Sequence, residues 1–547
     1  NSFYDLTLGP QSASLSVTAV DDMAVSNTLE ILNGYDTSLD ITSRTLSVGG
    51  VLNLTYLDAF PRADSTVELT ASIEATSLKA ASYAFNNLTF NGTGSWALEN
   101  ALNVDGNLTV SQANTSTNGV DFQGNTVSVL GDFSIAAIGK VTTGASLMSI
   151  GGHWTVTTGG VFSSSGSTVT FNASDTNNTI TSGGTSFDNV DFNNASGGWQ
   201  LQDVLITLGD FTVTQTDTTG LGVDLNSKGL TVGGDFYLNA GGKVTAGGDA
   251  PSNISVAGNW TVGNAGRFNS GQSTVIFNGT NQSIFGDTNF YKLTKTNVTS
   301  GNPYTLTFEA TKAQAISGLL NFQGFDADNR LSVHSSNHGA GNPQDRFWEI
   351  NPTGFYTVNY LDVQDSYNAG PSIYCQVGCQ DSGNNVGWLF GAPAVDIIVW
   401  TGGAGVGNPQ WSNGLNWLGG VVPTDTQTAK FSNASILPAT IDTAVDVGEI
   451  IIESGYAGTI TQSAALTIGT VTGGGFLQAG GTFSGSNDAI TIAGDFTRTG
   501  GTFSVGASNT TTFNASALKT IRSGGASFSN VTFNNAAGTW QLQDILD

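Results

Sequence analysis

The stretch Ser186-Phe187-Asp188-Asn189-Val190-Asp191-Phe192 decides the fold, because the chain repeats it at a long and nearly constant interval. Similar stretches stand at Ala84–Phe90 and Ser527–Phe533, and weaker ones stand at Ser2–Thr7 and Asn289–Thr294. The step from Phe85 to Phe187 is 102 residues, and the step from Phe187 to Phe290 is 103 residues. A fixed interval of this kind is typical of repeat proteins, in which each copy of the sequence builds the same structural unit.

A shorter motif recurs inside each long repeat: Gly, then Asp, Asn or His, then an aromatic residue or Leu. It stands at Gly106–Leu108, Gly131–Phe133, Gly152–Trp154, Gly209–Phe211, Gly234–Phe236, Gly258–Trp260 and Gly494–Phe496. Neighbouring copies within one long repeat follow each other after 21 to 25 residues. We interpret this period as one coil of a β-solenoid, with about four coils in each long repeat.

Short alternating segments supply the strands of these coils. In Thr168–Phe171 and its copy Thr274–Phe277, alternate residues share one face, so that Val and Phe can point inward while their neighbours face out. Coils stacked at about 4.8 Å would place like residues on like and form one continuous apolar core. The sequence therefore predicts an elongated all-β parallel solenoid. Tandem β-sandwich domains of the immunoglobulin type, near 100 residues each, are the alternative.

The composition agrees with an all-β protein and excludes several partners. The 547 residues include 72 Gly, only 11% are charged, and helix-forming stretches are almost absent. The formal net charge is −26, which repels nucleic acid and anionic lipid surfaces. No apolar run is long enough to span a bilayer, so we expect no membrane span in this segment.

Three regions follow one another along the chain. We expect a solenoid array over residues 1–300, a closing or junction β unit over 301–390, and a second solenoid module over 391–547 that begins after a short Gly-Ala-Pro-Ala link. The chain starts and stops inside matching repeats, from which we expect it to be a piece of a longer polypeptide.

Two regions resemble known bacterial surface proteins. The stretch from Val358 through Asp365-Ser366 to Trp388 resembles the closing unit of very large repetitive surface proteins. The motif Trp400-Thr401-Gly402-Gly403, with the tryptophans that follow it up to Trp417, resembles the opening of repeats in autotransporter-passenger and filamentous-haemagglutinin-like proteins. The resemblance implies a right-handed β-helix that serves as an adhesin, a stalk or a surface layer.

Candidate binding residues are few. Cys375 and Cys379 could close a small disulfide in an oxidising compartment, and two free thiols are the alternative. Asp326 and Asp328 are the best candidates for a Ca²⁺ site, with a solvated acidic loop as the alternative. The three histidines, His153, His334 and His338, form no convincing metal site, and His153 stands in the repeated turn motif. We therefore expect no cofactor apart from this Ca²⁺ candidate.

These observations favour a structural protein over an enzyme, because acidic and basic residues are not gathered as a catalytic site requires. We expect a component of an extracellular surface fibre, stalk or sheath, with further copies of the same protein joined end to end as its partners. A cell-surface adhesin that binds a glycan or another cell is the alternative. Both hypotheses place the protein outside the cell, at the cell surface.

Overall fold

The computed structural model describes residues 2–9, 13–74, 76–113, 117–247, 250–264, 266–301, 303–337, 345–370, 373–375, 377–390 and 397–546. These residues form parallel β-sheets with almost no helix, and the strands wind into a β-solenoid of about 23 turns. The prediction of an all-β solenoid is confirmed. The sandwich alternative is wrong, because each strand pairs in parallel with the strand one coil later. None of the helices formed by the described residues is long and apolar enough to cross a membrane.

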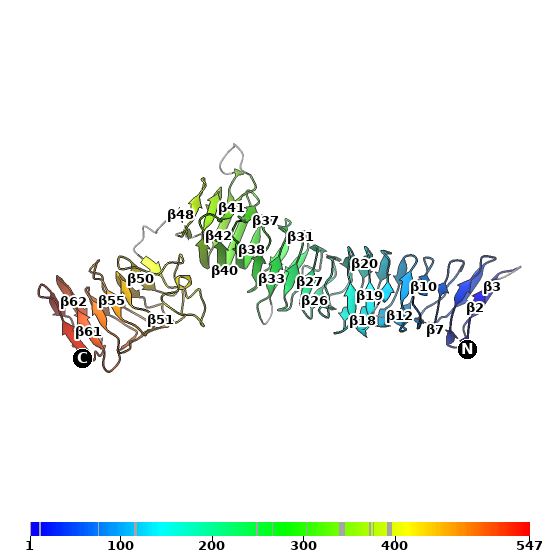
Figure 1. The fold of residues 1–547 in the computed structure, drawn as a ribbon, viewed down its shortest axis with the longest axis horizontal. Coiled ribbons are helices and arrows are strands. Elements are labelled where there is room, and N and C mark those ends of the chain that lie inside the picture. The colour runs from blue at the N-terminus through cyan, green and yellow to red at the C-terminus, as the bar shows by residue number, and fades with distance from the viewer. Residues whose placement is uncertain are drawn as a thin grey trace. The chain divides into compact units, whose positions relative to one another are not determined.

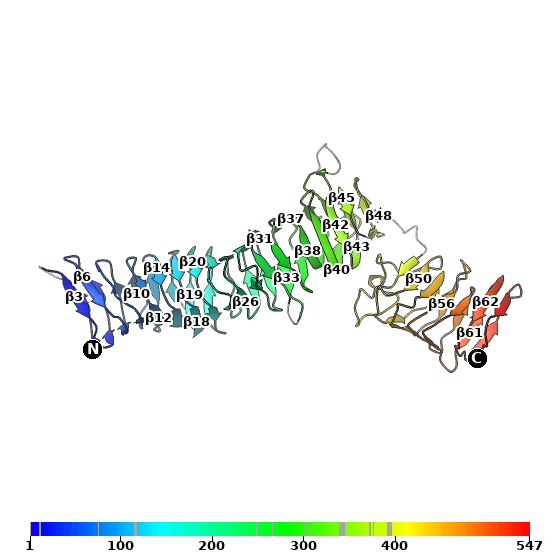
Figure 2. The same cartoon turned by 180° about the vertical axis from the view of Figure 1, so that it is seen from behind.

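The chain divides into two compact units, residues 1–294 with 306–314, and residues 295–305 with 315–547. In the first unit each coil gives one strand to each of three sheets. For example, β15 (Leu108–Gln112) lies in sheet 1, β16 (Val120–Asp121) in sheet 2 and β17 (Val127–Val129) in sheet 3, after which β18 (Phe133–Ile138) returns to sheet 1. Figures 1 and 2 show these strands stacked side by side from β2 (Leu6–Leu8) toward β31 (Phe236–Gly241).

The strands of the first unit can be grouped by sheet. Sheet 1 contains β1 (Ser2–Phe3), β4 (Met23–Val25), β7 (Thr45–Val48), β9 (Thr66–Leu69), β12 (Asn87–Asn91), β15, β18, β21 (Trp154–Val156), β24 (Asn178–Thr181), β26 (Trp199–Leu201), β29 (Val223–Asp224), β32 (Lys243–Thr245) and β35 (Arg267–Asn269). Sheet 2 runs from β2 to β22 (Val161–Ser163). Sheet 3 contains, in this unit, β11 (Ala84–Phe85), β14 (Leu102–Val104), β17, β20 (Leu147–Ile150), β23 (Thr168–Phe171), β25 (Asn189–Asn193), β28 (Phe211–Gln215), β31, β34 (Trp260–Val262), β37 (Asn281–Phe285) and β39 (Thr305–Phe308). Sheet 4 begins at β27 (Leu205–Thr207) and contains β30 (Leu230–Val232), β33 (Asn253–Val256), β36 (Thr274–Phe277) and β38 (Thr288–Thr296).

Alternation along the strands builds the core as the sequence predicts. In β23 the side chains of Val169 and Phe171 are buried and the two threonines are partly exposed, and β36 repeats this pattern with Val275 and Phe277. Because the pairing is parallel and in register, an inward residue lies over an inward residue of the next coil. The interior between these sheets is therefore filled mainly by stacked apolar side chains.

The long sequence repeat does not contain a whole number of coils. Four coils lead from Leu88 to its counterpart Ile180 on sheet 1, which is 92 residues later, and a fifth coil leads to Leu201, which is 113 residues later. A step of 102 residues falls between these two positions, so the equivalent strand lies in another sheet. The repeated stretch is β12 of sheet 1 in its first copy, β25 of sheet 3 in the second and β38 of sheet 4 in the third. The prediction of about four coils in each repeat was thus close, but each copy carries its residues to a new side of the solenoid.

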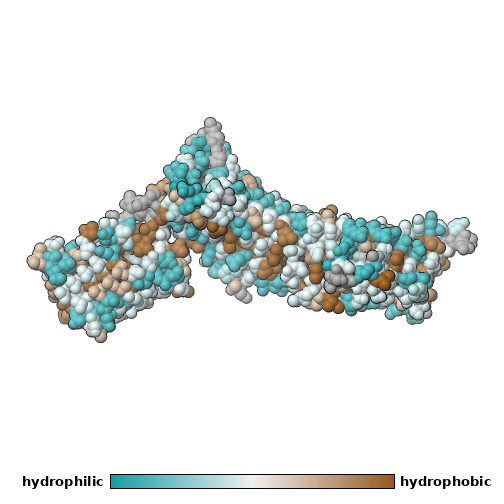
Figure 3. Space-filling model, in the orientation of Figure 1, coloured by the Kyte–Doolittle hydropathy of each residue, from teal (hydrophilic) through white to brown (hydrophobic). Residues whose placement is uncertain are grey.

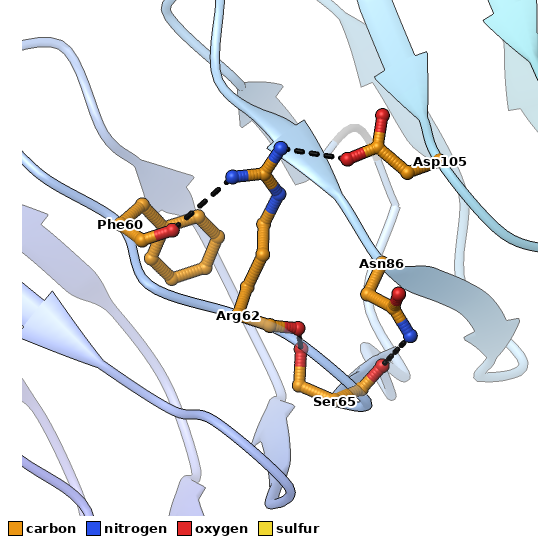
Figure 4. A network of polar contacts seen from close by, with 5 residues as sticks. All are labelled: Phe60, Arg62, Ser65, Asn86 and Asp105. Carbon is orange, nitrogen blue, oxygen red and sulfur yellow. Dashed lines mark hydrogen bonds and ion pairs between the residues drawn. The ribbon is translucent and has the colours of Figure 1, made fainter.

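Polar contacts tie the corners between coils. Figure 4 shows Arg62, whose guanidinium donates to the Asp105 carboxylate at 2.7 Å and to the Phe60 carbonyl at 3.3 Å. In the same corner the Asn86 amide donates to the Ser65 carbonyl, and the Ser65 hydroxyl donates to the Arg62 carbonyl. Arg62 and Asp105 are 43 residues apart, so this ion pair reaches past the neighbouring coil.

The second unit contains two stretches of described strands. The first includes β40 (Ala313–Gln323), β41 (Leu331–Ser335), β42 (Trp348–Pro352), β43 (Phe355–Asn359), β44 (Leu361–Gln364), β45 (Ser366–Asn368), β46 (Ile373–Cys375), β47 (Gln380–Asp381) and β48 (Trp388–Phe390). The predicted link at 391–394 lies outside the described residues. After it, one sheet contains β49 (Ile397–Val399), β50 (Thr428–Phe431), β53 (Glu449–Ile452), β56 (Phe476–Gln478), β59 (Phe496–Arg498), β62 (Leu518–Arg522) and β64 (Thr539–Leu542). Two further sheets begin at β51 (Ala439–Ile441) and at β52 (Val445–Val447) and complete the second module.

Aromatic residues close the beginning of the second module. The rings of Trp411 and Trp417 are 4.6 Å apart, and both pack against Phe431. The Trp417 indole donates to the Trp411 carbonyl at 2.8 Å. Asn416, in the 3-10 helix η2 (Gly414–Asn416), is fully buried and bonds to three backbone groups of the surrounding loop. The non-repetitive Trp-rich opening thus folds into a compact cluster at the start of the coils.

Candidate functional site

The second residue of the short motif forms a ladder along sheet 1. The Asn87 side-chain oxygen accepts a hydrogen bond from the backbone N–H of Asn107 at 2.9 Å. Asn107 accepts in the same way from Asp132, and Asp132 accepts from His153, both at 2.8 Å. The ladder continues through His153 Nδ1, which accepts from the backbone N–H of Thr179 at 3.0 Å. Each rung therefore satisfies a backbone donor of the next coil.

The same ladder recurs one repeat later on sheet 3. Asn189 accepts from the N–H of Asp210 at 2.8 Å, Asp210 from Asp235 at 2.8 Å, and Asp235 from Asn259 at 2.6 Å. Asn259 then accepts from Ser283 at 2.8 Å. The recurrence explains why Asp and Asn alternate freely at this position, since both carry the oxygen that the ladder requires.

The glycine of the motif makes room for this ladder. A Cβ added to Gly131 would lie 2.4 Å from Asn107 Oδ1, and one added to Gly234 would lie 2.3 Å from Asp210 Oδ1. Neither glycine has a positive φ, so backbone conformation does not require glycine here. Glycine is required because the side-chain oxygen of the previous rung lies too close for a Cβ atom.

The third residue of the motif stacks in the core. Leu108 lies in register with Phe133, and Phe133 with Trp154, whose ring is 4.4 Å from the Phe133 ring. On sheet 3 the Phe236 and Trp260 rings are stacked at 3.9 Å. The motif is therefore one structural device, in which Gly admits the rung, Asp or Asn forms it and the aromatic residue fills the interior.

His153 takes part in this ladder rather than in a metal site. Its Nδ1 must keep its lone pair toward the Thr179 N–H, which places the ring proton on Nε2. The Thr179 hydroxyl lies 2.9 Å from the same nitrogen. His334 Nδ1 lies 2.9 Å from the Ser335 carbonyl, and His338 lies outside the described residues. Within the described ranges, no group of three or more His, Cys, Asp and Glu side chains is placed to hold a metal ion.

The calcium candidate is organised as a turn. Asp326 Oδ1 accepts from the backbone N–H groups of Asp328 at 2.9 Å and Asn329 at 2.8 Å, and from the Asn329 amide at 2.8 Å. The Asn329 side-chain hydrogen bond, with smaller help from the backbone, holds the pKa of Asp326 below its usual value. Asp328 contributes its backbone to this turn, and its side chain is exposed.

Cys375 and Cys379 are joined by a disulfide, with their Cα atoms 5.9 Å apart. The loop that they close is held from two sides. Arg330 Nε donates to the Gly378 carbonyl at 2.7 Å, and the Leu361 N–H donates to Cys379 Sγ at 3.2 Å. Cys375 is fully buried at the end of β46, which pairs with β48.

Two hollows lie one repeat apart, one lined by Asp121 and the other by its equivalent Asp224. The aspartate that the two hollows share has a structural role, because in each copy it accepts a hydrogen bond from the backbone N–H two residues later at 2.9 Å. An exposed wall position changes from Asn118 to the apolar Leu221. These hollows are therefore a product of the repeated turn and not a conserved binding site.

Sequence reasoning missed the buried Lys295, although an alignment of the three copies shows a lysine at this inward position. The inward Phe90 and Phe192 of the first two copies correspond to Lys295 in the third, 103 residues after Phe192. Lys295 is fully buried, and its amine lies 5.1 Å from the centre of the Tyr304 ring. Burial lowers the pKa of this amine to about 8.

A buried guanidinium in the second module was also missed. Arg498 donates to the carbonyls of Ser523 and Gly501 at 3.0 and 2.8 Å and to the Gln478 side chain at 3.1 Å. Its isolated position in a polar sequence gave no signal of this role.

Comparisons of the chain with protein-family profiles, with curated proteins and with solved structures found no match.

Proposed function

We propose that this chain is a structural segment of an extracellular surface fibre, stalk or sheath, joined end to end with further copies of the same protein. The observation that carries the proposal is the stacking of successive coils, with one ladder of side-chain rungs along sheet 1 and a second along sheet 3. A coil that carries a rung is bonded to the next by its backbone, by that rung and by stacked inward residues, as in the coils of Asn107, Asp132 and His153. In such a stack each coil is stabilised by the coils on either side of it along one axis. This arrangement suits a protein that carries mechanical load.

The chemistry of the side chains supports a structural role rather than a catalytic one. The carboxylates of the ladders accept backbone hydrogen bonds and are thereby used in holding the coils. On the visible face of the first unit, polar and neutral residues surround separate apolar patches (Figure 3).

The disulfide supports a location outside the cell. Disulfides persist in oxidising compartments, whereas cytosolic thiols are kept reduced. The disulfide between Cys375 and Cys379 and the acidic, Gly-rich composition are consistent with an exported protein.

Electron microscopy with antibodies raised against the chain tests the proposal. Antibodies applied to intact cells of the source organism, without permeabilisation, are expected to label fibres or a surface layer. Pre-immune serum is the control. Labelling that requires permeabilised cells would contradict the extracellular location. Purified material that forms only compact monomeric particles would contradict end-to-end assembly.

A further inference from the structure

A hollow in the second module lies where the chain departs from its repeat. Three segments line it: the loop residues Trp411–Ser412, the loop residues Val422–Asp425, and Thr443–Asp446, which leads into β52. Its volume is about 500 Å³, within the range of roughly 300–1,000 Å³ that is typical of small-molecule sites. Binding residues commonly stand on such loops, held by a rigid scaffold of strands.

The wall of this hollow combines apolar and polar groups. Val422, Pro423 and Val445 supply apolar surface, and hydroxyl groups come from the neighbouring Ser and Thr residues. Two carboxylates, Asp425 and Asp446, complete the lining. Asp446 accepts a hydrogen bond from the Thr470 hydroxyl at 3.3 Å. Among the described residues, no hydrogen bond or ion pair uses the Asp425 carboxylate.

One residue of the lining carries a buried polar atom without a partner. Trp411 is 1% exposed, and its indole N–H is buried without a hydrogen-bond partner. Buried polar groups are normally paired, and an unpaired one requires an explanation such as a bound water or ligand. Among the described residues that line the hollow, one donor, the Trp411 indole, and one acceptor, the Asp425 carboxylate, therefore have no hydrogen-bond partner.

We propose that this hollow binds a neutral pyranose unit of a glycan. A hydroxyl both donates and accepts, so a sugar can serve unpaired groups of both kinds. The apolar wall suits the C–H face of the ring. The two carboxylates repel acidic sugars, which selects a neutral ligand. The site goes beyond the structural role, and a fibre without it would still be a fibre, so the two proposals can fail independently.

Saturation-transfer NMR with the full chain tests the site. The probes are neutral tetrasaccharides of glucose, mannose and N-acetylglucosamine, with tetragalacturonic acid as the anionic comparison. We expect at least one neutral probe to bind, and the acidic probe to bind at least tenfold more weakly. Failure of all three neutral probes to bind at millimolar concentrations would overturn the proposal, as would equal binding of the acidic one.

Two variants locate the binding. Asp425→Ala removes the free carboxylate, and Ala444→Trp fills the hollow from an exposed position without removing a polar group. Each is expected to weaken binding at least tenfold. Asp21→Ala, which removes an exposed carboxylate of the first unit, is the matched control and should bind like the native chain. Thermal unfolding checks that the variants fold. Native-like binding by folded Ala444→Trp would place the sugar elsewhere and overturn the assignment.

Discussion

The side-chain oxygen of Asn107 accepts a hydrogen bond from the backbone N–H of Asp132 at 2.8 Å, and Asp132 occupies the same motif position one coil later. Asp132 in turn accepts a hydrogen bond from His153, so the same contact is repeated from coil to coil. A corner between strands leaves backbone donors without a sheet partner, and this contact supplies one. The repeated motif therefore stabilises the solenoid at the places where its sheets cannot.

Replacing Asp132 by alanine should loosen the next coil. The His153 N–H, which donates to Asp132 at 2.8 Å, would lose its acceptor, and we expect a loss of about 1–2 kcal/mol in local stability. Hydrogen exchange of the peptide that contains His153 measures this loss. Asp132→Asn keeps the oxygen and should exchange almost like the native chain. Identical exchange in all three proteins would show that the rung contributes nothing.

Replacing Gly131 by alanine should destabilise the first unit by about 1–3 kcal/mol, because the new Cβ would meet Asn107 Oδ1 at 2.4 Å. Gly229→Ala is the matched control, since its Cβ would make only ordinary contacts of 3.5 Å or more. Urea unfolding of the full chain measures both. The explanation of the motif glycine fails if the two substitutions cost the same.

Lys295→Met should stabilise the protein near neutral pH. Burial lowers the pKa of Lys295 to about 8, against 10.5 for an ordinary lysine. Below pH 8 the folded state must hold a buried charge, at a cost of at most about 3 kcal/mol. Between pH 8 and 10.5 the unfolded chain binds more protons than the folded one, so native stability rises with pH.

Urea unfolding at pH 7 and pH 10 tests this dependence. The advantage of Lys295→Met over the native chain should be largest at pH 7 and should shrink at pH 10. An advantage that does not change with pH would mean that the buried amine carries no charge penalty.

Reducing the disulfide should weaken the loop that it closes. A loop of five residues gives about 2 kcal/mol in the chain-entropy account of disulfides. The thermal midpoint of the second unit is expected to fall when a reductant is added, and Cys375→Ala/Cys379→Ala should show the lower midpoint with or without reductant. Alkylation of both cysteines in the native, unreduced chain would show instead that the thiols are free.

Much of the fold could be predicted from the sequence because the repeats reveal their own period. The spacing of Gly131, Gly152 and their counterparts gave the coil length, and the alternation in Thr168–Phe171 gave the inward face. Local patterns suffice there, because a parallel in-register stack imposes the same requirement on every coil.

The side-chain contacts could not be predicted in the same way. The sequence marked Asp132 as a turn residue, but its bond to His153 depends on which backbone donor the next coil brings to it. The Asp425 carboxylate likewise acquires its setting from three segments that come together only in the fold. Lys295 is an intermediate case. Aligning the copies shows that a lysine replaces an inward phenylalanine, but only the fold shows that this lysine is buried.

The mismatch between the 102-residue repeat and the coil has a consequence for how such a gene can change. Duplicating or losing one repeat would leave the stack intact, because the new junction would still join like to like. Each strand beyond the junction would nevertheless move to a different side of the solenoid, just as the equivalent strands β12 and β25 lie in different sheets. A change in copy number would therefore alter the direction in which distant loops point as well as the length of the solenoid.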